Sequence, residues 1–258
     1  MSRRVSYTHE MTSVLEKLRR EGMAFEEVGS EILDTLWDLD VKLQTGRIPM
    51  ETYRNDKGNW WMDLVSQAII NSCGVEVRPD SMPGASETHN VDLAFTGKSG
   101  PVVCVEVKAQ GNPGYVLRGE RKPERRIQSD IDKRLKEVKY TSMDLKRKYD
   151  RGGVSGLLSL DKEQDWLEWK QKALPKFYAL WLGRKVSKEG EELLLKKFRE
   201  TMKYLNGIGA LVYEQQEHRS GYCEIEAFKR EFPISDTIQK IAADIRAVVS
   251  EANAGSDR

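Results

Sequence analysis

Cysteine and histidine are scarce in this chain, with three of each among 258 residues. The cysteines, Cys73, Cys104 and Cys223, are odd in number and widely spaced, which argues against a disulfide framework and against a zinc site built on thiolates. The histidines are equally scattered along the chain, so a histidine-based metal centre is not expected either. Any metal chemistry must therefore come from carboxylates.

The chain also lacks a long hydrophobic run and a large net charge. It has no apolar run of the length that spans a membrane, and its first residues do not resemble a signal peptide. We therefore expect a soluble, cytoplasmic protein with no membrane partner. Charged residues make up 32% of the chain, but the formal net charge is only +1. A surface that binds nucleic acid would consequently have to be a local one.

The most informative part of the sequence is a pair of apolar segments that carry three charged residues. The string VDLAF, residues 91–95, is followed after a short turn by VVCVEVKA, residues 102–109. Alternate side chains of a strand share a face, so Glu106 and Lys108 are neighbours roughly 7 Å apart, opposite Val105 and Val107. A hairpin around the turn brings Asp92 toward them.

Two carboxylates and a lysine at one end of an apolar hairpin can form the site of a metal-dependent phosphodiesterase. Mg²⁺ prefers oxygen ligands, usually one or two carboxylates together with water and substrate phosphate. Asp92 and Glu106 would supply the carboxylates, and the backbone carbonyl of Val107 a further oxygen. Lys108 would place a positive charge beside the attacking water, which it helps to orient and deprotonate. Because Glu-x-Lys is also common on solvent-exposed strand faces, the prediction depends on all three residues together.

This arrangement resembles the PD-(D/E)xK nuclease superfamily, which includes restriction endonucleases, Holliday-junction resolvases and repair nucleases. Asp92 matches the first acidic position, Glu106 the second and Lys108 the lysine, while Val91 stands where the family pattern has proline. The resemblance implies an α/β fold with a restriction-endonuclease-like core, in which helices flank a central mixed β-sheet. It also implies Mg²⁺ as the cofactor, for which Mn²⁺ can substitute.

The core of that family runs helix, three-strand meander, helix, strand, and the chain can be divided in this order. Residue spacing predicts helices at 59–72 and 129–149, and strands at 75–78, 90–95, 102–109 and 176–182. Residues 46–58 are predicted to form a polar loop. The predicted helix at 59–72 carries Trp61, which we expect to be buried.

The flanking regions are expected to add helices at both ends of the core. Helices are predicted at residues 11–21, 24–43, 189–204 and 234–249, and a hairpin at 209–214 and 223–228. We therefore expect an N-terminal helical segment (1–50), a nuclease core (51–185) and a C-terminal extension packed on that core (186–258).

Further acidic and imidazole side chains are candidates for the same site. Members of the superfamily often carry an additional acidic residue on the first helix, and Asp63 is the candidate for a second metal position here. An ordinary exposed carboxylate would fit that position equally well. Glu51 lies before the predicted helix and is a weaker candidate. His89 either approaches the site or belongs to a turn, and the turn is favoured.

A basic region follows the Glu-x-Lys strand. Residues 118–151 contain 13 Lys and Arg against 7 Asp and Glu. The first of these cations lie in a segment bounded by Gly and Pro, where we expect contacts with DNA phosphates. They are Arg118, Arg121, Lys122, Arg125 and Arg126. The cations of the following helix fit a solvated helix surface better.

These features favour a Mg²⁺-dependent endonuclease that acts on double-stranded DNA, most simply one of the type II restriction kind. A homodimer is expected, because cutting both strands of a symmetric site requires two active sites. A repair nuclease or a Holliday-junction resolvase is the alternative within the superfamily. A non-catalytic nucleic-acid-binding subunit with the same fold is the alternative outside enzymes.

Overall fold

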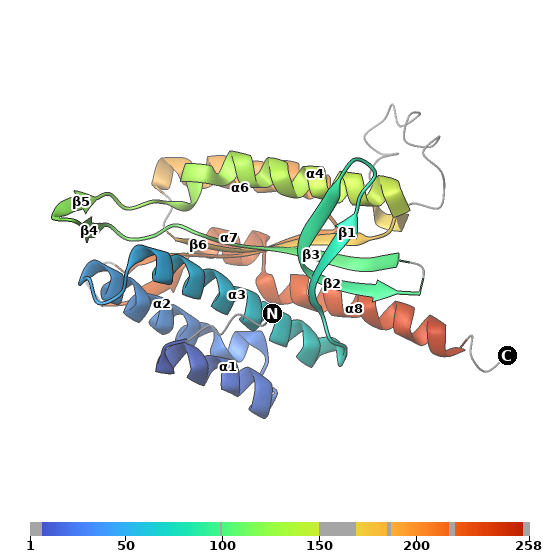
Figure 1. Cartoon of the computed structure of the whole chain (residues 1–258), viewed down its shortest axis with the longest axis horizontal. Helices are drawn as coiled ribbons and strands as arrows, with labels where there is room; N and C mark the ends of the chain where they lie inside the picture. Colours follow the sequence, from blue (N-terminus) through green and yellow to red (C-terminus); the bar gives the residue numbers. More distant parts are fainter. Residues whose placement is uncertain (1–6, 99, 150–168, 185–186, 217–219, 255–258) are drawn as a thin grey trace.

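A mixed six-stranded sheet forms the centre of the molecule, and helices cover both of its faces (Figure 1). The computed structural model describes residues 7–98, 100–149, 169–184, 187–216 and 220–254. The strand order is β1-β2-β3-β6-β7-β8. The predicted α/β class, with a central mixed sheet flanked by helices, is therefore confirmed.

The sheet combines an antiparallel meander with a parallel centre. β1 (Arg78–Pro83), β2 (Thr88–Gly97) and β3 (Gly100–Gln110) are antiparallel, and β3 pairs in parallel with β6 (Lys176–Arg184). β7 (Gly207–Gln215) pairs in parallel with β6, and β8 (Tyr222–Glu224) closes the sheet in the antiparallel sense. β6 and β7 are apolar along most of their length because both of their faces are buried. β4 (Tyr115–Leu117) and β5 (Glu120–Lys122) form a separate hairpin.

The helices form two layers. On one face lie α1 (His9–Glu21), η1 (Phe25–Val28), α2 (Gly29–Gln44), α3 (Met50–Cys73) and α8 (Ile234–Ala254). On the other lie η2 (Ile127–Asp130), α4 (Ile131–Tyr149), α6 (Lys188–Met202) and α7 (Glu226–Glu231). Each layer encloses its own apolar cluster against the sheet. The N-terminal segment therefore contributes to the first of these clusters, whereas the expected core and the C-terminal extension contribute to both.

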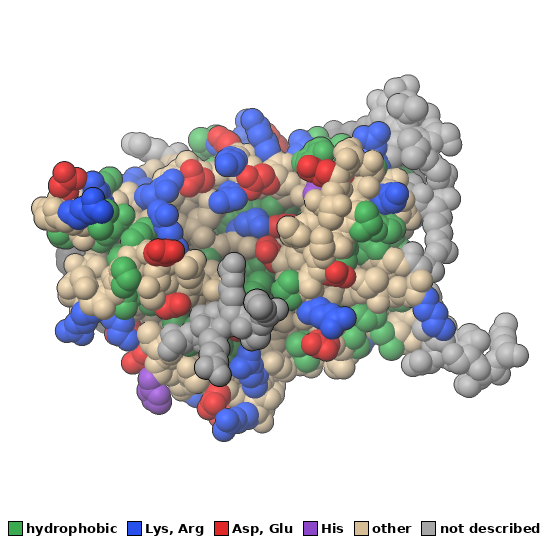
Figure 2. Space-filling model, viewed as in Figure 1, with side chains coloured by type: hydrophobic (Ala, Val, Ile, Leu, Met, Phe, Trp, Pro, Cys, Tyr) green, Lys and Arg blue, Asp and Glu red, His purple; other side chains and the backbone are tan. Residues whose placement is uncertain are grey.

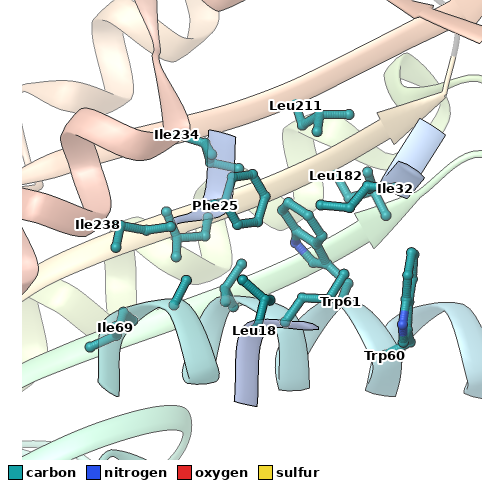
Figure 3. Packing of buried hydrophobic residues seen from close by; sticks show 14 of the residues in the cluster. Leu18, Phe25, Ile32, Trp60, Trp61, Ile69, Leu182, Leu211, Ile234 and Ile238 are labelled. Carbon is teal, nitrogen blue, oxygen red and sulfur yellow. The ribbon is translucent and has the colours of Figure 1, made fainter. Parts of the chain in front are cut away.

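Trp61 anchors α3 to the sheet, as expected from its place in the apolar stripe. Its side chain is fully buried and points from α3 toward the strands, near Phe25 and Leu182 (Figure 3). The Phe25 and Trp61 rings meet edge to face with centroids 5.8 Å apart. Trp60 is also buried, and its indole N–H donates to the backbone carbonyl of Met11 at 2.9 Å. Trp60 and Trp61 thus hold α3 against the sheet and against α1.

The prediction of a polar loop at residues 46–58 is wrong, because α3 already begins at Met50. Tyr53, Lys57 and Trp60 are buried at helical spacing and extend the apolar stripe of α3 toward its N-terminus. A buried lysine reads as polar in sequence, and this hid the first two turns of the helix. The helix ends as expected at Gly74, which adopts a left-handed conformation with φ of 72°.

Two predicted strands are also placed incorrectly. The strand expected at residues 75–78 instead runs from Arg78 to Pro83, where it forms an edge of the sheet that tolerates proline. The second strand of the C-terminal hairpin ends at Glu224, and residues 226–231 form α7. Ile225 and Phe228 are both buried because they are spaced for one face of a helix, not because they alternate along a strand. Within the described residues, no helix is long and apolar enough to cross a membrane.

Candidate active site

Asp92 lies where strands β2 and β3 part. β2 pairs with β1 through Val91, but its pairing with β3 begins only at Leu93, opposite Val105. Where the ladder would otherwise continue, the backbone N–H of Val107 donates to Asp92 Oδ2 at 2.8 Å. Because the N–H and C=O of one strand residue point the same way, the Val107 carbonyl faces the same gap. Because β2 and β3 diverge here, the Asp92 carboxylate and the Val107 carbonyl both face the gap between the two strands.

The three predicted catalytic side chains contact one another in this gap. Lys108 Nζ donates to Asp92 Oδ2 at 3.1 Å and forms an ion pair with Glu106 Oε2. Glu106 is the most enclosed of the three, with 9% of its side chain exposed, against 33% for Asp92. The sequence pattern therefore brings together the residues that it singled out.

Burial and like charge act on this cluster together. Burial raises the pKa of Glu106 above its ordinary value; Lys108 opposes this, and the adjacent Asp92 carboxylate adds to it. Burial alone would lower the pKa of Lys108, but the Glu106 and Asp92 carboxylates outweigh it and raise that pKa. Lys108 is therefore an ammonium group, which can donate hydrogen bonds and offset negative charge.

The donor set fits a hard divalent cation such as Mg²⁺. The contacts among the three side chains fall on Asp92 Oδ2 and Glu106 Oε2, so Asp92 Oδ1 and Glu106 Oε1 accept none of them. Within the described residues, no group of three or more His, Cys, Asp or Glu side chains is arranged to hold a metal. A site with two carboxylates and one backbone carbonyl suits Mg²⁺, which usually keeps water and substrate phosphate as its other ligands.

A cleft of about 410 Å³ opens beside Lys108. Its wall consists of the N-terminal part of α3, the end of β3 with the following turn, and the segment that leads into α4. The charged side chains that line it are six cations and one acid, listed here: Arg54, Lys57, Lys108, Arg125, Arg126, Arg134 and Asp130. Figure 2 shows a hollow in the middle of this face, between α3 and α4, in which basic and acidic side chains meet. The cleft can therefore accept an anionic ligand next to the three-residue cluster.

The cations of the cleft differ in how they are paired. Arg125 contacts Asp130 at 2.5 Å, Arg126 contacts Glu124 at 3.3 Å and Arg134 contacts Glu137 at 2.8 Å. Arg54, by contrast, is exposed and forms no ion pair with any described residue. Sequence reasoning missed it because residues 46–58 were expected to be a loop. A predicted helix that began before residue 54 would have placed Arg54 one turn before the buried Lys57.

The predicted DNA-binding residues fall into two groups. Arg125 and Arg126 line the cleft. Arg118, Arg121 and Lys122 belong instead to the β4–β5 hairpin and its turn, which projects from the body beyond the cleft (Figure 1). The segment that was expected to be a loop bounded by Gly and Pro is thus partly a hairpin.

The remaining candidates lie apart from the cluster. Asp63 accepts a hydrogen bond from the hydroxyl of Tyr7 at 2.8 Å and lies 4.0 Å from Arg19, and no contact among the described residues joins it to Asp92, Glu106 or Lys108. Glu51 is exposed in the first turn of α3. His89 is buried in β2, where its Nε2 lies 2.8 Å from Asp144 Oδ2, so it belongs neither to a turn nor to the cleft.

A buried charged cluster behind the cleft was not anticipated. Asp40 Oδ1 accepts from Tyr53 at 2.7 Å, and Asp40 Oδ2 accepts from Arg184 Nε at 2.8 Å and from Tyr222. Arg184 also reaches Glu124 at 2.9 Å, next to the cleft residues Arg125 and Arg126. This cluster holds the cleft wall in place from the inside.

Lys57 connects the buried cluster to the end of β3. Its Nζ donates to the carbonyl of Gly111 at 2.7 Å and to the hydroxyl of Tyr53 at 3.2 Å. Gly111 has φ of 84°, and a Cβ there would come within 2.7 Å of Arg184 Cβ, so the turn after β3 requires glycine. Burial lowers the pKa of Lys57 to about 8.

Comparisons of the chain with protein-family models, with curated proteins and with solved structures gave no match.

Proposed function

We propose that this protein is a metal-dependent endonuclease that hydrolyses phosphodiester bonds of double-stranded DNA, of the type II restriction kind. The observation that carries the proposal is the contact of Asp92, Glu106 and Lys108 where β2 and β3 diverge, beside a cleft that is lined with cations, including Lys108. The fold we propose for this core is the restriction-endonuclease-like one, since the order α3, β1–β3, α4, β6 agrees with it.

Asp92 and Glu106, with the carbonyl of Val107, would hold Mg²⁺ or Mn²⁺. Such an ion supplies Lewis-acid catalysis: it lowers the pKa of bound water and offsets charge on the phosphate. Lys108 donates hydrogen bonds on the cleft side of the two carboxylates, where it orients the attacking water and stabilises the charge that develops on phosphorus. Water oxygen bonds to phosphorus as the P–O3′ bond breaks, which leaves a 5′-phosphate and a 3′-hydroxyl.

The cations of the cleft position the DNA strand for this step. Arg54, Arg125 and Arg126 would bind phosphates on either side of the scissile one, because cleft walls concentrate the field of like charges. A homodimer would place one site on each strand of a symmetric sequence.

The test is cleavage of a supercoiled plasmid in Mg²⁺ or Mn²⁺ by the wild-type protein and by Asp92→Asn and Lys108→Ala. We expect nicked and linear products from the wild type, none in chelator, and a loss of about 10²-fold or more in each variant. Matched controls are Asp80→Asn, an exposed carboxylate on β1, and Lys196→Ala, an exposed lysine on α6, both of which should cleave as the wild type does.

The pattern of products separates the alternatives within and outside the class. Discrete fragments support a restriction enzyme, whereas cleavage of four-way junctions but not of linear duplex indicates a resolvase. DNA binding without cleavage in any divalent metal would refute the enzyme and favour a non-catalytic binding subunit.

A further inference from the structure

The β4–β5 hairpin is attached rigidly to the wall of the cleft. At its base, Asn112 and Arg125 exchange two backbone hydrogen bonds, of 2.8 and 2.9 Å. The residues on both sides of this bridge line the cleft, and Tyr115 packs against the apolar cluster below the sheet. The hairpin therefore has a fixed direction relative to Lys108, although its tip extends away from the body (Figure 1).

Two aliphatic side chains near the tip are exposed. Val116 is 60% exposed and Leu117 is 46% exposed. Single exposed aliphatic residues are common, but Val116 and Leu117 expose one side chain on each face of a two-stranded hairpin, which has little stability of its own. Such a surface is better explained by a partner than by the folded chain.

Arginines without ion-pair partners accompany these aliphatic side chains. Val116 is paired with Arg121 across the hairpin, so the two side chains share a face. Arg118 and Gly119 form the turn with φ of 52° and 80°, the signature of a type I′ turn, in which Asn or Gly is normally preferred at the first position. Within the described part of the chain, neither Arg118 nor Arg121 forms an ion pair, whereas Lys122 contacts Glu120 at 2.6 Å. The arginine at the apex of the hairpin therefore occupies a position for which this turn favours Asn or Gly.

We infer that the β4–β5 hairpin enters the major groove of duplex DNA and reads base edges beside the cleavage site, an inference that depends on the proposed function. The major groove admits a two-stranded β-ribbon. Arginine can bind guanine through two hydrogen bonds, and aliphatic side chains can contact the methyl group of thymine. This assigns Val116 and Arg121, on one face of the hairpin, and Arg118 at its turn to sequence recognition, and leaves Arg125 and Arg126 for the backbone.

A second copy of the chain is a poorer occupant of this surface. In a two-fold contact between hairpins, the unpaired arginines of one copy would face those of the other. Like charges across an interface oppose association, whereas the phosphates that border a DNA groove attract them.

The inference is tested by selecting duplexes from a randomised library with the cleavage-deficient Lys108→Ala protein and sequencing what is bound. In that background we compare the hairpin variants Val116→Ser and Arg121→Ala, which change one face, with the controls Leu117→Ser and Lys122→Ala, which change the other face. We expect an enriched motif with the Lys108→Ala protein and with both controls, and a loss of enrichment of about tenfold at some positions in each hairpin variant. Affinity for unselected duplex should fall much less in Val116→Ser.

Three outcomes would overturn the inference. One is that the Lys108→Ala protein enriches no motif, and the second is that the hairpin variants enrich the same motif to the same degree. The third is that Val116→Ser changes the oligomeric state in sedimentation while the motif is unchanged, which would assign the hairpin to contact between copies. Plasmid cleavage by the wild type is measured in parallel. If the hairpin variants lose the motif but the wild type does not cleave the plasmid, the proposed nuclease function is rejected and the role of the hairpin in sequence recognition is kept.

Discussion

Two charged clusters lie at the ends of the adjoining parallel strands β3 and β6, and they differ in one respect. Asp40, behind the cleft, is 1% exposed, and hydrogen bonds occupy both of its carboxylate oxygens. Asp92 is partly exposed, and only its Oδ2 takes part in the contacts of its cluster. A carboxylate whose two oxygens both accept hydrogen bonds thus serves a structural cluster, whereas a carboxylate with an oxygen left for a ligand serves a candidate site.

The largest effect should come from breaking the buried cluster. Arg184→Met leaves Asp40 and Glu124 without their shared cation, and the loss of one partner from a buried pair costs about 3–5 kcal/mol of unfolding free energy. Urea unfolding followed by circular dichroism measures it. Arg19→Met, which removes an exposed cation, serves as the control and should change stability by less than about 0.5 kcal/mol. Equal effects of the two changes would show that the buried cluster of Asp40 and Arg184 contributes no more to stability than an exposed cation does.

A substitution in the candidate site should lower cleavage strongly and stability only slightly. Glu106→Gln removes one of two neighbouring carboxylates, and we expect cleavage to fall by about 10²-fold while the unfolding free energy changes by less than about 1 kcal/mol. The amide keeps the shape of the side chain and relieves the repulsion with Asp92. Rates from plasmid cleavage and midpoints from urea unfolding are compared on the same preparation. A variant that unfolds easily but still cuts would show that Glu106 belongs with the structural cluster.

Lys57, which lies between the two clusters, provides a test by pH. Burial lowers its folded-state pKa from 10.5 to about 8, so between these values the unfolded chain binds more protons than the folded one. The contribution of Lys57 to stability therefore rises with pH across this window, by on the order of 2 kcal/mol between pH 7.5 and 9.5. The difference in unfolding free energy between the wild type and Lys57→Met, measured over that range, isolates this contribution. A difference that is flat with pH would mean that burial does not lower the pKa of Lys57.

The sequence was sufficient to predict that Asp92, Glu106 and Lys108 lie together. It was not sufficient to predict the buried cluster of Asp40 and Arg184, and the reason is physical. Asp92, Glu106 and Lys108 lie within two short apolar strands, so the two-residue period of a strand and one turn are enough to bring them together. Arg184 and Asp40 are 144 positions apart, and their contact depends on how α2 packs against the end of β6. No local pattern records such a contact. A buried lysine such as Lys57 also defeats binary patterning, since its carbonyl partners come from the turn after β3.

The smallest effect concerns the cations of the cleft, where the same comparison can be made between single side chains. Arg54 has no ion-pair partner among the described residues, whereas Arg134, on the same cleft, is paired with Glu137. Arg54→Ala should therefore weaken duplex binding by about 1 kcal/mol and reduce the salt slope of log Kd by about one, because one phosphate contact is lost. Arg134→Ala should change both quantities less, because that guanidinium must first give up Glu137. Anisotropy titrations of one duplex at several salt concentrations measure both. If Arg134→Ala has the larger effect, the absence of an ion-pair partner is not what makes a cation of this cleft available to phosphate.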